Sequence, residues 1–143
     1  MKILKSLFFI SLLLAGSCSV ESEKINYGNE ACHFCKMTIV DNQHAAEIVT
    51  AKGKVFKYDA IECMLNDLKQ KKDIKIALYF VNDYSDPGVL QNAETATFLI
   101  SKGIKSPMGA FLSAFKSDTE AQKAMQANGG KLYNWKEIQN VIE

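Results

Sequence analysis

The stretch EIVTAKGKVFKYDAIECMLNDL, residues 47–68, decides the fold. Two β-prone runs on either side of Lys52-Gly53 predict a β-hairpin over residues 47–58. Asp59, with Glu62 three residues later, is a capping-box pattern and predicts that a helix starts there. The apolar residues that follow recur at helical spacing and predict one packed stripe, namely Ile61, Met64, Leu65 and Leu68. The stretch therefore encodes a strand–strand–helix unit.

The rest of the chain repeats this order. Strands are expected at residues 76–81, 95–100 and 110–115, and helices after Ser117 and after Asn134. The run at 76–81 is apolar on both faces, which predicts a central buried strand. Asp86-Pro87-Gly88 marks residues 82–90 as a loop. Because strand pairs alternate with helices and no long parallel βαβ pattern occurs, the fold class is α+β, with two small strand–strand–helix units.

Composition excludes several classes of protein. The chain has 143 residues, with 17 basic and 16 acidic side chains, and every basic one is lysine. Direct readout of DNA or RNA relies on arginine and a basic surplus, so nucleic acid is not an expected partner. No phosphate-binding glycine motif occurs. The near-neutral balance also predicts that no polybasic patch attaches the protein to a membrane.

The first segment is predicted to be an export signal. Residues 1–17 carry lysines followed by an apolar run that is too short for a transmembrane helix, which needs about 20 residues. Small residues precede Cys18, as in a bacterial lipoprotein signal, so we expect cleavage there and lipidation of Cys18. Ordinary cleavage with an incidental cysteine is the alternative. If Cys18 is lipidated, residues 18–30 are a lipidated end and polar tether, and residues 31–143 are the functional domain.

The chemistry is concentrated in Cys32-His33-Phe34-Cys35-Lys36-Met37. Besides Cys18 three cysteines remain, an odd number that argues against a closed disulfide framework in an exported protein. Thiolate and thioether together are soft ligands that suit Cu(I) best. If Cys35 and Met37 lead into a strand at Thr38–Val40, their sulfurs project on the same side. The alternative is an ordinary pair of buried cysteines with a core methionine.

Cys63 is a further candidate ligand. At 100° per residue it lies about 200° from Ile61 and so faces away from the apolar stripe. Its place in the first helical turn favours a lowered thiol pKa, which the neighbouring Asp59 and Glu62 oppose. A structural cysteine under a neighbouring loop is the alternative. Met64 lies on the stripe and is expected in the core.

Met108 lies between Pro107 and Gly109, so a stiffened loop presents its thioether, which favours a ligand over a packing role. Met125 fits a helical stripe and is expected in the core. His33 and His44 are possible ligands, although a histidine beside a C-x-x-C often only shapes the loop.

At these residues the chain resembles the NosL family of copper chaperones for assembly of nitrous oxide reductase. The resemblance covers about residues 28–136, and its motifs are Cys32-x-x-Cys35-x-Met37, Asp41 with Ala45-Ala46-Glu47, Lys52-Gly53-Lys54, Tyr58-Asp59 with Cys63-Met64, Ser106-Pro107-Met108-Gly109, Ala114-Phe115, Ala121 and Gly129-Gly130. Two features depart from the family pattern. Many members have glycine where Lys36 stands, and not all have a cysteine matching Cys63.

The resemblance implies a membrane-anchored periplasmic protein whose fold is similar to that of organomercurial lyase. It implies Cu(I) bound through Cys35, Met37 and Met108, with Cys32 and Cys63 as further candidates. It also implies that nitrous oxide reductase or its membrane assembly machinery is the partner.

Metal delivery without turnover is the leading hypothesis, so the protein is not expected to be an enzyme. Cu(I) would pass to a partner by ligand exchange, with weakly binding thioethers keeping it releasable. Two alternatives are a thiol–disulfide oxidoreductase that uses the C-x-x-C, and a structural zinc module built from Cys32, Cys35, Cys63 and a histidine.

Overall fold

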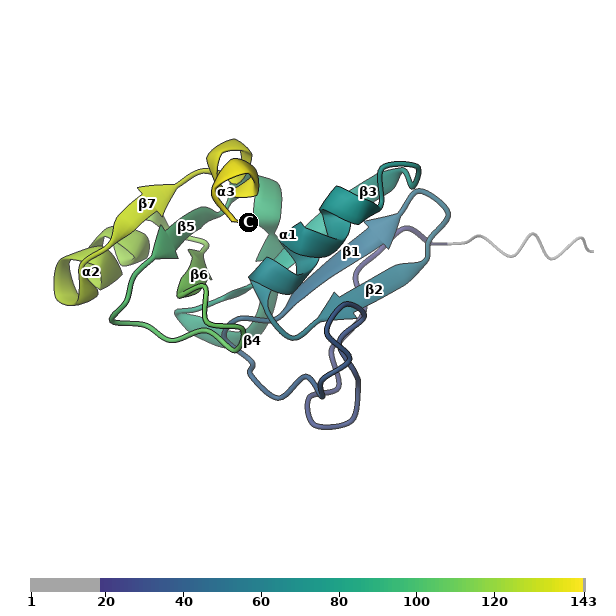
Figure 1. Ribbon diagram of the computed structural model, residues 1–143, viewed down its shortest axis with the longest axis horizontal. Helices are drawn as coiled ribbons and strands as arrows, with labels where there is room; N and C mark the ends of the chain where they lie inside the picture. Colours follow the sequence, from purple (N-terminus) through teal and green to yellow (C-terminus); the bar gives the residue numbers. More distant parts are fainter. Residues whose placement is uncertain (1–18, 143) are drawn as a thin grey trace, which may run out of the picture.

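A four-stranded antiparallel sheet forms the larger unit (Figure 1). The computed structural model describes residues 19–142. The sheet has the order β2-β1-β3-β4, built from β1 (Ala46–Thr50), β2 (Val55–Tyr58), β3 (Ile76–Asp83) and β4 (Asp86–Asn92). Helix α1 (Ile61–Gln70) follows β2 directly and packs on β1 and β2. The predicted hairpin and helix are confirmed, and Gly53 makes the turn with φ 78°.

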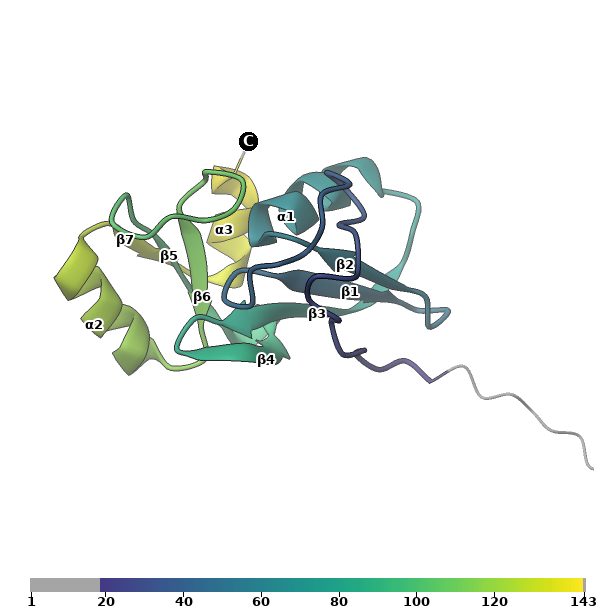
Figure 2. The ribbon, with the colours of Figure 1, turned by 90° about the horizontal axis from the view of Figure 1, so that it is seen from below.

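A three-stranded antiparallel sheet of order β6-β5-β7 forms the smaller unit. Its elements are η1 (Ala93–Thr95), which precedes it, then β5 (Thr97–Ile100), β6 (Leu112–Phe115), α2 (Asp118–Asn128), β7 (Lys131–Tyr133) and α3 (Trp135–Val141). Helix α2 packs on this sheet, and α3 lies between the two units (Figures 1 and 2). All strand pairs among the described residues are antiparallel, which confirms the α+β class.

One core joins the two units. Its buried side chains come from both sheets, from α1 and from α3, and include Ile48, Tyr58, Met64, Phe98, Leu112 and Ile138. A smaller cluster under α2 contains Leu99, Phe115 and Ala121, with Met125 packed against it. Met64 is fully buried and Met125 partly buried, so both methionines lie where the sequence predicted.

The loop predicted at residues 82–90 is wrong, because β4 begins at Asp86. β4 is an edge strand, where Pro87 removes no hydrogen bond that a further strand would need. The register of β3 and β4 shifts at Asn82/Asp83. The N–H of Gly88 (φ 85°) donates to the Asn42 carbonyl, outside the sheet. The turn residues thus shape an irregular edge rather than end the sheet.

The N-terminal segment lies against the larger sheet from Glu23 onward. The Glu23 N–H donates to Glu47 Oε1 at 3.0 Å, Lys57 Nζ donates to the Lys24 carbonyl at 2.9 Å, and Ile25 is buried. Part of the predicted tether therefore belongs to the folded domain. Cys18 and the predicted signal lie outside the described residues. No helix in the described part is long and apolar enough to cross a bilayer.

Candidate metal centre

A tight loop holds the C-x-x-C. The Cys32 N–H donates to the Met37 carbonyl at 2.8 Å, and the Lys36 N–H returns to the Cys32 carbonyl at 3.1 Å. Closing so short a loop places Lys36 at φ 67°, the left-handed region that favours glycine. The glycine that the family resemblance implies at this position thus has a conformational reason.

The loop is fixed to the larger sheet and does not continue as a strand. The His33 N–H donates to the Lys57 carbonyl of β2 at 2.8 Å. The strand considered for Thr38–Val40 does not form, because only an isolated bridge joins Ala31 and Thr38. Two backbone hydrogen bonds form this bridge, from the Cys32 N–H to the Met37 carbonyl and from the Ile39 N–H to the Glu30 carbonyl, and the pairing does not extend into a strand.

Helix α1 brings the third thiol to this loop. Cys63 lies in the first turn of α1, and its sulfur and those of Cys32 and Cys35 all lie within 4.8 Å of one another. Cys32 and Cys63 are each 1% exposed, whereas Cys35 is partly exposed. All three are free thiols, so the cluster is a set of three sulfur ligands with Cys35 on its outer side.

Hydrogen bonds hold the pKa of Cys32 low, at about 5. The largest cause is the Cys63 thiol, which donates its proton to the Cys32 sulfur, and the backbone N–H groups of Asp59 and Cys35 assist. The Cys35 N–H lies 3.5 Å from Cys32 Sγ. A buried thiolate at Cys32 is stable at neutral pH because three donors replace its water.

The other two thiols keep their protons. The Cys63 pKa is raised, chiefly because its proton is held by Cys32 and then because of burial. Burial also raises the Cys35 pKa, with the Cys32 charge adding to it. The three thiols therefore carry one negative charge near pH 7, and a soft metal ion would displace the remaining thiol protons.

The predicted capping role of Asp59 is wrong. Ala60 occupies the N-cap position of α1 and no side chain caps the helix. Asp59 is buried with Oδ1 unpartnered, and burial, followed by the Cys32 charge, raises its pKa. Its backbone N–H is directed to the Cys32 sulfur, so this turn serves the thiol cluster instead of the helix.

The two candidate methionine ligands lie on exposed loops at this end of α1. Met37 closes the C-x-x-C loop and is 54% exposed. Met108 is 43% exposed, on the long loop between β5 and β6 (Figure 2). The thiols gather in the core while the thioethers remain at the surface.

A buried carboxylate, which sequence reasoning missed as a functional residue, ties the Met108 loop to the thiol cluster. Glu62 precedes Cys63, and its Oε1 accepts hydrogen bonds from Ser106 Oγ at 2.6 Å and from the Ala110 N–H at 3.3 Å. Both donors flank Met108. The sequence offered one indication of this link, because Ser106 belongs to the same family motif as Met108.

Neither histidine joins the thiols. His33 stacks on Phe56, with ring centroids 4.4 Å apart, and its Nε2 lies 3.2 Å from Lys71 Nζ; burial and that ammonium lower the His33 pKa. Both ring nitrogens of His44 are occupied, by Asp41 at 3.0 Å and by Ser113 at 3.1 Å. The zinc module that needs a histidine is therefore not assembled among residues 19–142.

The fold and its cysteine cluster agree with the comparisons to known proteins. A family model for NosL matches residues 25–142. The chain belongs to the NosL family. The predicted family resemblance is thereby confirmed, and the match begins at the buried Ile25 of the N-terminal segment.

Two individual relatives extend this comparison. The copper-binding lipoprotein NosL of Stutzerimonas stutzeri is 25% identical over 124 residues, covering 81% of this chain and 65% of the relative. The chain thus spans about two thirds of that relative's length. The crystal structure of the copper chaperone NosL from Shewanella denitrificans superposes with a TM-score of 0.70 at 22% identity, covering 83% of this chain and 96% of that one. The fold is shared; the likeness to organomercurial lyase stays a prediction.

Proposed function

We propose that this protein is a copper chaperone that holds Cu(I) on its cysteine cluster and releases it to a partner by ligand exchange. The observation that carries the proposal is the approach of three free thiols within 4.8 Å, with no histidine or carboxylate in the group. An all-sulfur donor set selects Cu(I) over harder cations. Membership of the NosL family and the copper-binding relatives support the same cargo.

The arrangement suits transfer better than storage. Cys32 and Cys63 are inaccessible, whereas Cys35 is partly exposed, two residues before the exposed Met37, and Glu62 ties the loop of the exposed Met108 to the turn that carries Cys63. A thioether binds more weakly than a thiolate, so copper held partly by the methionines can leave when a partner's sulfur or nitrogen arrives. Cys35, Met37 and Met108 are therefore the proposed exchange ligands, and Cys32 and Cys63 the retaining ones.

The geometry disfavours a thiol–disulfide oxidoreductase. Such an enzyme needs an exposed thiolate to attack its substrate. Here the thiol with the lowered pKa, Cys32, is 1% exposed, and the accessible Cys35 has a raised pKa. The C-x-x-C also precedes a loop rather than a helix.

We further propose that Cys18 is lipidated, that the protein faces the periplasm of a bacterial cell envelope, and that nitrous oxide reductase or its assembly machinery receives the copper. The export signal and the lipoprotein relative support the anchor. Transfer from the copper-loaded protein to copper-free nitrous oxide reductase, followed by the recovery of activity, tests the recipient. A thiol peptide of equal concentration that activates the enzyme equally well would argue against a dedicated donor.

Competition against a Cu(I) chelator tests the cargo and its ligands. One Cu(I) per chain is expected, with only sulfur neighbours in X-ray absorption. Cys35→Ser should lower the affinity by about tenfold or more, and Met37→Leu or Met108→Leu should weaken it less but speed release.

Met125→Leu is the matched control, because that methionine packs in the smaller core cluster and should leave the competition unchanged. If Cys35→Ser, Met37→Leu and Met108→Leu all bind copper like the unmodified chain, the assigned ligands are wrong.

A further inference from the structure

Lysines from two distant turns gather at one end of the larger unit. The β1–β2 turn supplies Lys52 and Lys54, and the segment between α1 and β3 supplies Lys72 and Lys75, all four exposed. The near-neutral charge balance predicted no polybasic patch, but a net charge does not reveal lysines that are distant in sequence and gather only in the fold. Most carboxylates nearby are paired with other lysines, Asp67 with Lys71 at 3.3 Å and Glu23 and Glu30 with Lys57 at 3.5 and 2.8 Å, and Asp73 is the one carboxylate in the lining described next.

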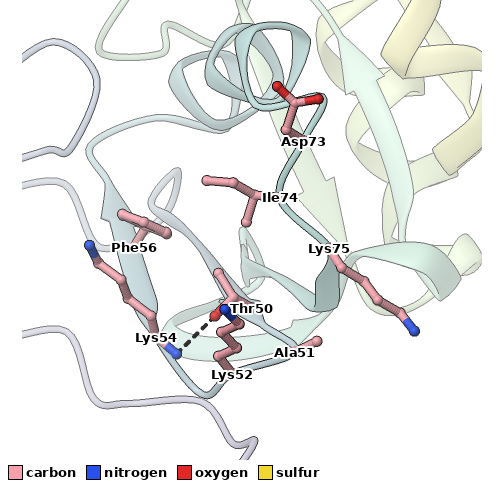
Figure 3. A pocket seen from close by; sticks show the side chains of 8 residues that line it. All are labelled: Thr50, Ala51, Lys52, Lys54, Phe56, Asp73, Ile74 and Lys75. Carbon is pink, nitrogen blue, oxygen red and sulfur yellow. Dashed lines mark hydrogen bonds between the residues drawn. The ribbon is translucent and has the colours of Figure 1, made fainter.

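An open, largely apolar cavity of about 540 Å³ is lined by three of these lysines, Lys52, Lys54 and Lys75. Phe56 and Ile74 face each other across it, and Lys54 runs alongside Phe56 while Lys75 points outward on the other side (Figure 3). The ammonium groups of Lys54 and Lys71 each lie 4.7 Å from the centre of the Phe56 ring. Ile74 is 41% exposed, so an apolar side chain stands in the middle of a cationic rim.

The described chain begins at this same end. In both ribbon views the N-terminal segment leaves the molecule beside the β1–β2 turn (Figures 1 and 2). Its last fixed points are Glu23 and Lys24, so residues 19–22 span at most about 14 Å. A lipid on Cys18 would therefore hold this end of the molecule close to the bilayer surface.

We propose that this end, formed by Lys52, Lys54, Lys72, Lys75 and Ile74, binds the surface of an anionic phospholipid membrane. Lysines rimming an exposed apolar residue match a layer of phosphate headgroups above acyl chains, because the ammonium groups reach the phosphates while the apolar atoms enter the interface. This inference rests on the proposed lipidation of Cys18 for its geometry, but the lysines act on the membrane directly.

The contact would orient the molecule for copper transfer. Cys63 lies at the first turn of α1 and Lys72 just beyond its last turn, so the length of the helix, about 14 Å, separates these two residues. With the lysines on the membrane, the first turn of α1 and the Met108 loop that Glu62 holds there would lie at the other end of the helix, toward a partner.

Lysine footprinting on vesicles tests this orientation. The full lipoprotein is added to vesicles of phosphatidylglycerol and phosphatidylcholine, or of phosphatidylcholine alone, and labelled with a membrane-impermeant acetylating reagent. Mass spectrometry then gives the rate at each lysine. On anionic vesicles Lys52, Lys54, Lys72 and Lys75 should react at least about fivefold more slowly, the factor expected for one lysine near an anionic surface. High salt should abolish the protection.

Lys102 and Lys116, exposed on the smaller unit, are internal controls and should react equally on both vesicles. The double variant Lys52→Gln/Lys75→Gln should lose most of the protection at Lys54 and Lys72, whereas Lys102→Gln/Lys116→Gln should keep it. Equal rates on both vesicles, or protection spread over all lysines, would overturn the proposal. The mass of the N-terminal peptide reports lipidation separately, and no step depends on bound copper. Failure of the membrane proposal can therefore be told apart from failure of the proposed copper function.

Discussion

The hydrogen bonds among Cys32, Cys35 and Cys63 decide which of the three sulfurs is a thiolate. Cys63 donates and Cys32 accepts, so the most buried sulfur pair carries the charge while Cys35 stays protonated at the surface. From the sequence, the helix favours a lowered Cys63 pKa and the neighbouring Asp59 and Glu62 oppose it. In the structure the Cys63 pKa is raised, chiefly because the Cys32 thiolate holds the Cys63 proton.

The Cys63→Ala variant should raise the Cys32 pKa by at least about one unit, because it removes the strongest donor to that thiolate. In the reduced, metal-free chain, the ultraviolet absorbance of one thiolate should persist at pH 7 and vanish as the pH falls through about 5. In the variant it should vanish at higher pH. Cys35→Ala keeps the Cys63 donor and should shift the midpoint much less. No thiolate absorbance at pH 7 in the unmodified chain would contradict this proton distribution.

Glu47 is a fully buried carboxylate whose pKa is raised to about 7, chiefly by burial. The folded-state pKa of Glu47 lies above its ordinary value of 4.5, so the contribution of Glu47 to stability is fully present below about pH 4.5. This contribution is lost as the pH rises through about 7. Glu47→Gln keeps the acceptor for the Glu23 N–H and removes the charge. It should stabilise the protein at pH 8 by up to about 3 kcal/mol and have little effect at pH 4.

Urea unfolding at both pH values measures the difference for Glu47→Gln. Glu94→Gln, at an exposed position, is the control and should show no such pH dependence. A Glu47→Gln gain of equal size at both pH values would point to packing instead of charge.

At the scale of elements, local patterns predicted most of the fold. Alternation and helical spacing located the hairpin, β3, β5, β6 and all three helices, because each depends on contacts within a few residues. They failed where distant structure overrides a local signal. Pro87 reads as a strand breaker, yet it lies in an edge strand. Asp59 reads as a helix cap, yet it lies buried beside the thiols.

Helix caps offer a matched pair of variants. Asn134 accepts a hydrogen bond from the Glu137 N–H at 2.9 Å within a complete capping box on α3, whereas the Ser117 side chain at the N-cap of α2 accepts none. Asn134→Ala should therefore cost about 1 kcal/mol of unfolding free energy, and Ser117→Ala less than about half of that. Urea denaturation of the two variants measures both losses, and equal losses would mean that the capping box contributes nothing specific.

At the scale of the whole molecule, the sites are assembled from segments that are distant in sequence. The motif around Cys32 identified the ligand types, but no periodicity relates that loop to Cys63, and only the packing of α1 on β1 and β2 joins them. The lysine-rich end was missed for the same reason, since it exists only after two turns meet. Composition and spacing thus predict which chemistry is present, and tertiary contacts decide where it gathers.

The link between the two units at Glu62 allows copper release to be tested without altering any sulfur. Ser106→Ala removes the 2.6 Å hydrogen bond to Glu62 Oε1 and leaves the Ala110 N–H as its remaining donor. We expect a loss of about 1–3 kcal/mol in unfolding free energy and severalfold faster removal of Cu(I) by a chelator, because the Met108 loop is freed.

Ser101→Ala is the matched control, since this buried hydroxyl donates to the Asn128 carbonyl at 2.9 Å within the smaller unit. It should cost similar stability yet leave copper removal unchanged. If both serine variants speed removal equally, general destabilisation explains the effect and the Glu62 link does not control the site.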